Sequence, residues 1–401
     1  MLRKVDEAVN ILKNLLKRYP DNQELLNIKY NLCYRIDGTN SLDISSLKLT
    51  NNKTIVIHLG HNISCFNPKE NDPRISGSEF MALNLAKEFV KLEYRVIVVG
   101  SFEDNISKLN YEGLHDDIEY IDYKYFNEFV LKYVVDYLIV SRQTCNLVYY
   151  NNIKNVYLWV HDVLPVNTNS KGFQIHKNKF KGIIAISNWQ KNNIIKKLNL
   201  PEELFIVSRN AIYIERFLNK NIKKIPYRFI YSSMPDRGLS NLIKIIPLIK
   251  QKYPETTLYI FANKNNIDTE LLDIIESSDY IFLSPRLKQD ELAIEFLKSD
   301  IWLYPTSFQE TYCITSLEAM AAKCLVATVN YCGLGEIVYK KGVVCESPIE
   351  NNLENLVEKL FFVLERPKLK EFFIEKAYNW AINQTYQNLA QEWVENIFKL
   401  N

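Results

Sequence analysis

The sequence lacks any long uninterrupted apolar stretch. No run reaches the ~18 residues that a membrane-spanning helix needs, and the amphipathic stretch 1–22 carries a charge every few residues. We therefore expect neither a standard secretion signal nor a transmembrane segment. Net charge is also nearly absent, at +2 with both signs well mixed, so nothing in the composition calls for nucleic acid as a partner.

Cysteine pairs are missing as well. The seven cysteines are an odd number, widely spread, and form no C-x-x-C pair. This usage predicts reduced, mostly buried thiols in a cytoplasmic protein. What is present is a chain of 401 residues, 47% hydrophobic and 24% charged, which is ordinary for a globular protein and long enough for two large α/β domains.

The first 34 residues place apolar side chains at helical spacing on both sides of a break at Pro20. This pattern predicts a helical hairpin over 1–40, about the length of one tetratricopeptide unit. One such unit cannot bury its own apolar face, so it packs either on the main domain or on a protein partner. We favour the main domain, because repeat architectures usually need about three units. A polar linker over 37–52 follows.

From Lys53 onward, short runs rich in Ile and Val alternate with helical patterns. Such runs are typical of a parallel sheet covered on both faces. The alternation restarts after a charged join at 219–226, which indicates two Rossmann-like domains, over 53–218 and 226–370, facing a cleft. The pattern near the end of the chain predicts one long or kinked helix over 371–398. Residues 371–401 are a candidate for crossing back to the first domain. Strands are predicted at 54–59, 95–100, 118–121, 137–141, 156–160, 182–186, 205–208, 229–232, 257–261, 280–283 and 301–304.

The stretch 303–338 holds two carboxylates, Glu310 and Glu318, on which the functional interpretation rests. A polar loop ending at Glu310 follows an apolar run, and a helix is predicted from near Thr315. Glu310 would then lie at the carboxyl end of a parallel strand, where ligands bind in open α/β sheets, beside a helix N-terminus suited to phosphate. Glu318 either closes a capping box that Thr315 begins or binds a ribose diol, and spacing alone does not separate these readings.

Three other loops carry candidate residues. Gly77 permits close backbone approach and Ser78 can cap a helix, so this turn either binds an anion or is an ordinary cap. His161 ends an apolar strand, where a single histidine is more often a satisfied polar residue than a catalyst. Arg237 is either a diphosphate clamp beside a helix N-terminus or a surface arginine in a Pro-Asp turn, and we favour the clamp because its loop faces the same cleft as Glu310.

Taken together, five separated motifs resemble the retaining glycosyltransferases of family 4, which have the two-domain GT-B fold. The run ETYCITSLEAMAA, from Glu310 to Ala322, looks like the family's E-x7-E region. The resemblance spans 53–398 and leaves the N-terminal hairpin outside. The other motifs, at 76–79, 160–162, 209–212 and 233–239, are similar to the family's Gly-Gly-Ser-Glu loop, histidine loop, Asn-Gly turn and phosphate loop.

The resemblance implies a role for each motif. Glu318 would hold the donor ribose, Glu310 the hydroxyls of the transferred sugar, and Arg237 the diphosphate. His161 would contact the sugar near the reacting centre, which makes His161, Glu310 and Arg237 the expected catalytic residues. Further donor contacts would come from the backbone at Gly77, from Ser232, from the amides of Tyr312, Cys313 and Ile314, and from Arg286 and Leu287 near the base.

The chain departs from the family pattern at several positions. Where many members carry two cations in the phosphate loop, this chain has Ser232 and a single cation, Arg237. Ala211, Ser76 and Lys323 stand where glycines are common. The missing cation is expected to weaken donor affinity, whereas the helix dipole and Arg237 remain to stabilise the leaving group.

The implied activity is transfer of a sugar from a nucleotide diphosphate sugar of the UDP or GDP type to a hydroxyl of a glycan, lipid or protein acceptor, with retention at the anomeric carbon. Because no Asp-x-Asp triplet occurs, we expect no divalent metal and no cofactor besides the donor. Two alternatives stay open: a nucleotide-sugar epimerase on the same fold, and a non-catalytic nucleotide-sugar-binding scaffold. We expect a cytoplasmic protein. The lysines and phenylalanines of 171–181 leave contact with a membrane surface as an alternative to a solvated loop.

Overall fold

A computed structural model describes residues 11, 15, 18, 52–60, 65–68, 75–103, 117–130, 132–144, 147, 150–166, 179–218 and 220–399. Apart from residues 11, 15 and 18, the predicted hairpin over 1–40 lies outside the described residues, as do most of the linker after it and most of the loop 171–181. The described chain divides into two compact units. The first comprises the residues up to Ile184 together with Pro201–Ile206, and the second comprises Ala185–Leu200 and the residues from Val207 onward.

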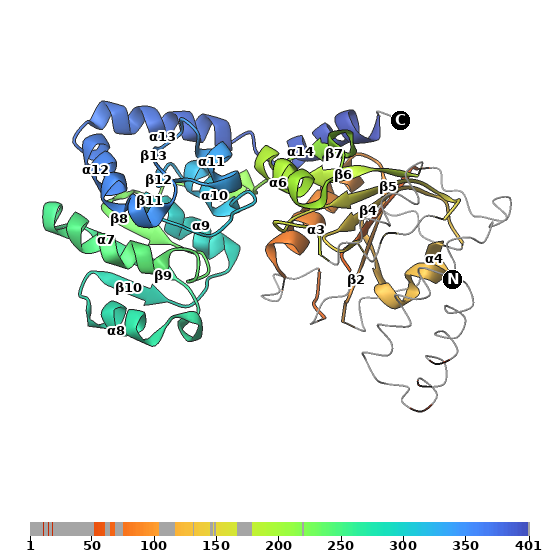
Figure 1. The fold of residues 1–401 in the computed structure, drawn as a ribbon, viewed down its shortest axis with the longest axis horizontal. Helices are drawn as coiled ribbons and strands as arrows, with labels where there is room; N and C mark the ends of the chain where they lie inside the picture. The colour runs from red at the N-terminus through yellow and green to blue at the C-terminus, as the bar shows by residue number, and fades with distance from the viewer. Residues whose placement is uncertain are drawn as a thin grey trace. The chain divides into compact units, whose positions relative to one another are not determined.

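A seven-stranded sheet forms the centre of the first unit, in the order β3-β2-β1-β4-β5-β6-β7 (Figure 1). The neighbours from β3 to β6 pair in parallel. Strands β1 and β2 are buried along their whole length and consist mainly of Ile and Val, as expected for strands covered on both faces. Helices α3 (Gly77–Lys91) and α4 (Phe126–Val130) lie between strands, and α6 (Asn188–Leu198) follows β6. The strands are β1 (Thr54–His58), β2 (Arg95–Gly100), β3 (Glu119–Asp122), β4 (Val135–Ser141), β5 (Ile153–Trp159), β6 (Phe180–Ala185) and β7 (Phe205–Val207).

A six-stranded parallel sheet forms the centre of the second unit, in the order β10-β9-β8-β11-β12-β13. Its strands are β8 (Ile225–Tyr231), β9 (Thr257–Phe261), β10 (Ile281–Ser284), β11 (Ser299–Tyr304), β12 (Leu325–Asn330) and β13 (Val343–Glu346). The helices that follow these strands are α7 (Leu239–Lys252), α8 (Thr269–Ser277), α9 (Gln289–Lys298), α10 (Ile314–Ala321), α11 (Cys332–Val338), α12 (Leu353–Leu364), α13 (Pro367–Ala381) and α14 (Tyr386–Trp393).

The order of the strands reverses once in each sheet. In the second sheet β9 and β10 extend from β8 in one direction, whereas β11, β12 and β13 extend in the other. The loops after β8 and β11 therefore diverge at a topological switch point, which is the usual place for a ligand in an open α/β sheet. In the first sheet the corresponding point lies between β1 and β4. The two parallel sheets confirm the predicted α/β architecture.

The segment predicted as one long or kinked helix over 371–398 is interrupted. Helix α13 ends at Ala381, and α14 begins after Thr385, whose hydroxyl accepts a hydrogen bond from the amide of Asn388 at 3.1 Å. The glycine-bearing segment 332–338 forms helix α11. Gly333 is required there because a Cβ atom would lie 2.0 Å from the carbonyl oxygen of Thr311.

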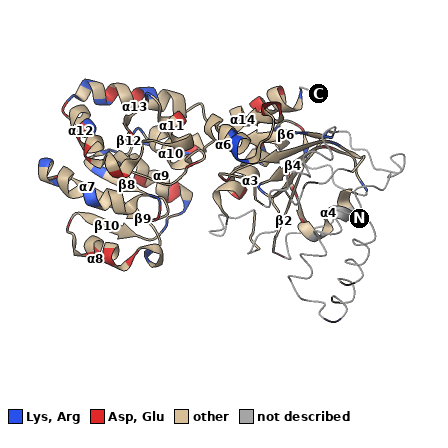
Figure 2. Cartoon of the chain, viewed as in Figure 1, with Lys and Arg blue, Asp and Glu red and all other residues tan. Residues whose placement is uncertain are grey.

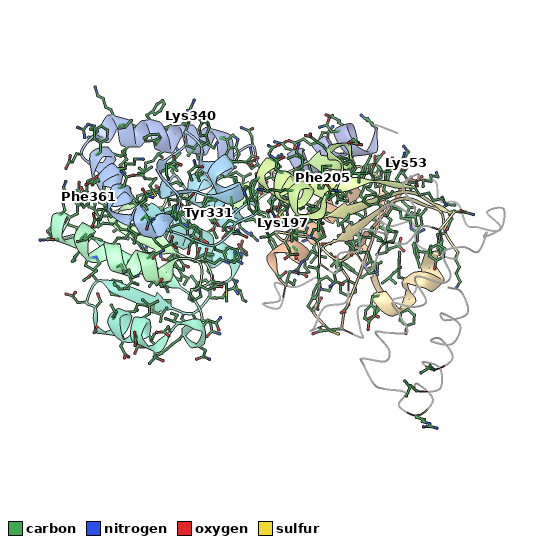
Figure 3. The ribbon with its side chains drawn as sticks, viewed as in Figure 1. Lys53, Lys197, Phe205, Tyr331, Lys340 and Phe361 are labelled. Atoms are coloured by element: carbon green, nitrogen blue, oxygen red, sulfur yellow. The ribbon has the colours of Figure 1, made fainter. Side chains whose placement is uncertain are left out.

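Side chains fill the space between each sheet and its helices (Figure 3), as the burial of Phe229, Ile246 and Trp302 illustrates in the second unit. Lys and Glu are interspersed on the outer helices α12 and α13, whereas the charged residues of α7 are all lysines (Figure 2). Across the described residues, no helix has the length and apolar character needed to cross a bilayer.

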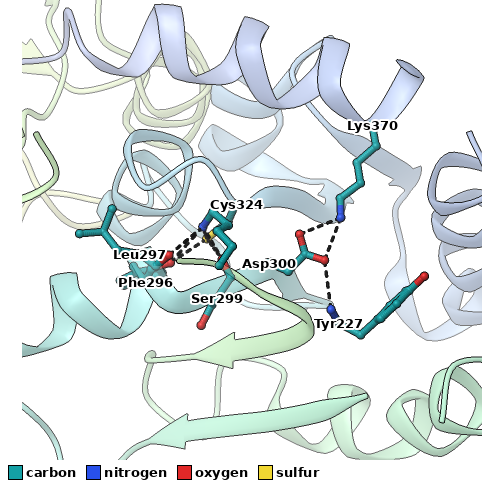
Figure 4. Close-up of polar contacts among 8 residues, drawn as sticks. Tyr227, Phe296, Leu297, Ser299, Asp300, Cys324 and Lys370 are labelled. Carbon is teal, nitrogen blue, oxygen red and sulfur yellow. Dashed lines mark hydrogen bonds and ion pairs between the residues drawn. The ribbon is translucent and has the colours of Figure 1, made fainter. Parts of the chain in front are cut away.

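A buried polar contact attaches α13 to the strands beneath it (Figure 4). The Lys370 ammonium lies 2.7 Å and 2.8 Å from the two carboxylate oxygens of Asp300, and the backbone amide of Tyr227 donates to the same carboxylate at 3.1 Å. Beside it, the Lys224 ammonium donates to carbonyl groups at the end of α9, including those of Phe296 and Leu297. A cation at a helix C-terminus is favourable because the last carbonyl groups have no partners within the helix.

Candidate active site

Two loops meet at the switch point of the second sheet. The β8–α7 loop covers 232–238, and the β11–α10 loop covers 305–313. The side-chain amide of Asn241 donates to the carbonyl oxygen of Pro305 at 3.1 Å, and Arg237 Nη1 lies 3.2 Å from Glu310 Oε1. These contacts place the predicted residues Arg237 and Glu310, which are far apart in sequence, in one site.

The carboxylate of Glu310 is held from one side. Its Oε1 atom accepts hydrogen bonds from the Tyr304 hydroxyl at 2.7 Å and from Arg237 Nη1 at 3.2 Å. Only 6% of the residue is exposed, and no hydrogen bond reaches Oε2 from the described part of the chain. Oε2 is therefore available to accept a hydrogen bond from a ligand.

Arg237 is more constrained than a surface arginine would be. Its guanidinium lies over the Phe308 ring, 4.2 Å from the centroid. Burial is the largest single effect and disfavours the charged form, but Glu310, Tyr304, Cys313 and Asp236 together outweigh it, so the pKa of Arg237 is raised. Within the described residues, the buried Nε of Arg237 and the buried hydroxyl of Ser232 have no hydrogen-bond partner. Two unsatisfied buried donors in one loop point to a ligand with acceptor oxygens.

The structure excludes the capping box that Thr315 and Glu318 could have formed. Helix α10 begins at Ile314, its N-cap residue is Cys313 with φ 74°, and no side chain caps it. The hydroxyl of Ser316 donates back to the carbonyl oxygen of Cys313 at 2.7 Å. Glu318 therefore lies inside the helix and is not its cap.

Glu318 is a buried carboxylate without a partner. It is 8% exposed, and none of the described residues gives its carboxylate a hydrogen bond or an ion pair. Burial raises the pKa of Glu318 to about 7, although the nearby Arg216 opposes this effect. Arg216 itself pairs with Asp290 at 2.8 Å. Burying an unpaired carboxylate is costly, so this position favours a ligand that supplies donors, such as a diol.

The other predicted donor-binding residues of the second unit lie in two places. Tyr312 and Cys313 are buried and, with Ile314, lead directly into α10. Arg286 and Leu287 follow β10, which lies two strands away from β8 in the sheet. They share the carboxyl edge with Glu310, but no hydrogen bond or ion pair joins them to Glu310 or Arg237 where the structure describes the chain.

In the first unit, Gly77 and His161 lie on the predicted loops. Gly77 opens helix α3, and no atom would come within 4 Å of a Cβ atom there. The expectation that Ser78 caps α3 was wrong, because the N-cap is Ser76, whose hydroxyl donates to the carboxylate of Glu79. His161 lies beside Trp159, with ring centroids 4.3 Å apart. Burial lowers the pKa of His161 to about 3, so the imidazole is neutral near pH 7.

Arg142 is a residue of this region that the sequence analysis missed. It follows β4 with φ 65° and forms a bidentate contact with Asp162, at 2.8 Å and 3.0 Å. Its Nη1 atom lies 3.9 Å from the carboxylate of Glu79. Arg142 thereby connects the end of β4, the loop that carries His161 and the start of α3. A charged residue directly after a buried strand was the available signal.

The comparison with protein families identifies the region that holds the two loops. Residues 215–380 match the family model described as glycosyl transferases group 1. This range includes Ser232, Arg237, Glu310 and Glu318, and it excludes the strands of the first sheet. No curated protein matches the chain by sequence.

Solved structures similar to the chain extend the likeness to both units. A glycosyltransferase from Rickettsia africae ESF-5 is 18% identical, with 88% of this chain and 99% of that chain covered and a TM-score of 0.68. HepE from Anabaena, solved with UDP-glucose, is 15% identical, with coverages of 86% and 99% and a TM-score of 0.62. WaaG, a glycosyltransferase involved in lipopolysaccharide biosynthesis, is also 15% identical, with the same coverages and a TM-score of 0.61. These likenesses show that the chain has the GT-B fold.

The contact between the two loops gives a first testable prediction. Gly238 has φ +98°, and a Cβ atom there would lie 2.5 Å from the carbonyl oxygen of Pro305. We expect Gly238→Ala to lower the free energy of unfolding by about 1–3 kcal/mol, because it adds backbone strain and separates the loops. The matched variant Gly77→Ala has open space and should leave stability nearly unchanged. Urea denaturation of the wild type and both variants measures the free energy of unfolding. A Gly238→Ala variant as stable as the wild type would contradict the prediction.

Proposed function

We propose that this chain is a retaining glycosyltransferase that moves a sugar from a nucleotide diphosphate sugar of the UDP or GDP type to an acceptor hydroxyl. One observation carries the proposal. In the region that matches the glycosyl transferases group 1, Glu310 has a carboxylate oxygen, Oε2, that accepts no hydrogen bond from the described residues. It lies beside a loop with two buried donors, on Arg237 and Ser232, that also lack a partner there. A nucleotide sugar has hydroxyl groups for the former and phosphate oxygens for the latter.

The proposed roles follow from this chemistry. Glu318 accepts hydrogen bonds from the ribose diol, and Glu310 Oε2 accepts from a hydroxyl of the transferred sugar. The Ser232 hydroxyl and the Arg237 guanidinium, with the amides of 312–314, bind the diphosphate. As the bond to the sugar breaks, negative charge grows on the departing phosphate. Arg237 and the N-terminus of α10 stabilise that charge without rearranging.

In the first unit, the proposed contacts are His161 with the sugar and the backbone of Gly77 with the β-phosphate. A neutral imidazole suits a hydrogen bond to a sugar hydroxyl and does not suit a charged contact with phosphate. Retention then results from attack on the face that the phosphate leaves, with the departing phosphate helping to remove the proton of the acceptor. No divalent metal takes part in this proposal.

A thermal-shift panel of UDP-, GDP-, ADP- and dTDP-sugars tests the donor. Binding at 100 times the Kd should stabilise the protein by about 2.7 kcal/mol. We expect a UDP- or GDP-sugar to raise the Tm, and a flat response to every member would contradict the proposal. Glu318→Ala is the control for the site, because it should reduce the shift without unfolding the protein.

The donor found in this panel then enters a transfer assay with glycan, lipid and protein acceptors, with and without EDTA. Transfer that persists in EDTA is the expected result, whereas loss that Mg²⁺ or Mn²⁺ restores would contradict metal independence. Conversion of the donor without an acceptor would instead indicate an epimerase. Binding with no turnover in any arm would indicate a nucleotide-sugar-binding scaffold.

A further inference from the structure

Tyr304, which no motif singled out, is buried at the site and makes several contacts within the sheet. It is the last residue of β11 and is fully buried. Its ring stacks on Trp302, with centroids 4.9 Å apart and an interplanar angle of 26°. Its carbonyl oxygen accepts a hydrogen bond from the Thr328 hydroxyl at 2.6 Å. The main chain of Tyr304 is therefore held by the neighbouring strand β12, and its ring lies against Trp302 of the same strand and Tyr231 of β8.

This immobile tyrosine directs its hydroxyl at the carboxylate of Glu310. The O–H donates to Oε1 at 2.7 Å, and Arg237 Nη1 reaches the same oxygen at 3.2 Å. Burial raises the pKa of Tyr304, so the hydroxyl keeps its proton and remains a donor. Two donors on one oxygen set the plane of the carboxylate and leave the other oxygen uncommitted.

Removal of the hydroxyl would change what Glu310 can do. Without the Tyr304 hydrogen bond, the carboxylate is free to turn both oxygens toward the guanidinium of Arg237, since a bidentate arginine–carboxylate pair is the stronger arrangement. Oε2 would then be occupied by Arg237, and Arg237 would offer fewer donors to a phosphate. The Tyr304 hydroxyl prevents this internal pairing by keeping Oε1 engaged from the side of the strand.

We propose that Tyr304 is a positioning residue that orients Glu310 so that Oε2 faces the transferred sugar, a role that rests on the proposed glycosyl transfer. In this role Tyr304 does not touch the sugar. Tyr304 acts through Glu310, as partners in the outer shell of metal sites and catalytic sites act through the groups they orient. A purely structural hydrogen bond would stabilise the fold and leave the reaction of the folded protein unaltered.

Tyr304→Phe in the full chain tests this role, with kcat for transfer and Kd for UDP measured on the same preparation. We expect kcat to fall roughly 10- to 100-fold, while Kd for UDP, which has no sugar, changes less than about 2-fold. Tyr231→Phe is the matched variant, because it removes another buried hydroxyl, one that donates to the Met234 carbonyl at 2.6 Å and not to Glu310.

A double-mutant cycle with Glu310→Gln separates positioning from stability. In the Glu310→Gln background, Tyr304→Phe should have almost no further effect on kcat. Whatever change in kcat Tyr231→Phe causes should be the same in the wild-type and Glu310→Gln backgrounds. Equal effects of Tyr304→Phe in both backgrounds, or a fall in Tm with unchanged kcat, would overturn the inference. If the wild type transfers sugar but Tyr304→Phe matches it, only this role fails. If the wild type turns over no nucleotide sugar, the proposed function fails and the role fails with it.

Discussion

Glu310→Gln should reduce kcat for sugar transfer by about 10²- to 10³-fold, while the Kd for UDP changes by no more than about 3-fold. Glutamine has nearly the same shape as glutamate, so its side-chain carbonyl can still accept from Tyr304 and Arg237. What is lost is the negative charge on the oxygen that would face the sugar. That charge matters most when positive charge develops at the reacting carbon, so the loss falls on turnover and not on nucleotide binding.

Steady-state kinetics with the donor from the thermal-shift panel, together with calorimetry of UDP, measure the two quantities independently. Glu365→Gln is the matched control. It also removes a carboxylate from an ion pair, with Lys252, but both of those side chains are more than a third exposed and lie outside the two loops. Exposed pairs contribute little, so we expect unchanged kinetics. Full transfer activity in Glu310→Gln would contradict the role assigned to Glu310.

The region around Glu310 shows what local pattern can predict. An apolar run that stops at Pro305 indicated the end of a strand, and β11 does end at Tyr304. The helix after the polar loop was expected from near Thr315 and begins at Ile314. Both predictions succeed because proline and hydrophobic periodicity act over a few residues, and the burial of β11 between helices agrees with them.

The capping box failed for a physical reason that the sequence does not display. Thr315 and Glu318 have the right spacing for it, but Cys313 adopts a left-handed backbone and the helix begins one residue earlier than the pattern suggested. The Ser316 hydroxyl then bonds to the carbonyl oxygen of Cys313. Loop geometry set by the contact with Gly333 overrides the local signal, since the amide of Gly333 donates to the carbonyl oxygen of Glu310 at 2.9 Å.

Tyr304 and Arg142 could not be found by spacing at all. Tyr304 matters because its hydroxyl contacts the carboxylate of Glu310, which the following loop brings back to the end of the strand. Arg142 matters because its guanidinium connects three separate elements. Such contacts depend on strand order and register, which hydrophobic patterns do not encode. A motif search weights loop residues, whereas these two residues lie at the ends of buried strands.

Glu318 should make both stability and donor binding depend on pH. Burial raises the pKa of Glu318 from 4.5 to about 7 in the folded protein. Between these values the folded state binds a proton that the unfolded state has lost, so stability is highest below pH 4.5 as far as this group is concerned and declines as pH rises toward 7. The decline should amount to about 1–3 kcal/mol and should be absent in Glu318→Gln.

Urea denaturation at pH 5 and pH 8 measures this difference. The wild type should approach Glu318→Gln in stability at pH 5 and be less stable than it at pH 8. A variant that is no more stable than the wild type at pH 8 would mean that the carboxylate has partners in solution. Glu365→Gln again serves as the control, because Lys252 lowers the pKa of Glu365 and its titration falls below this range.

Donor binding should follow the opposite trend, because a ribose diol donates its hydrogen bonds to the ionised carboxylate. We expect the affinity for the nucleotide sugar to increase as pH rises through about 7, and Glu318→Gln to bind more weakly with little pH dependence. The sugar diphosphate itself does not titrate in this range, so calorimetry with the intact donor reports on the protein. A 2′-deoxy donor removes half of the diol and should lose most of the pH dependence. If the deoxy donor and the ribose donor show the same pH profile, Glu318 does not bind the ribose.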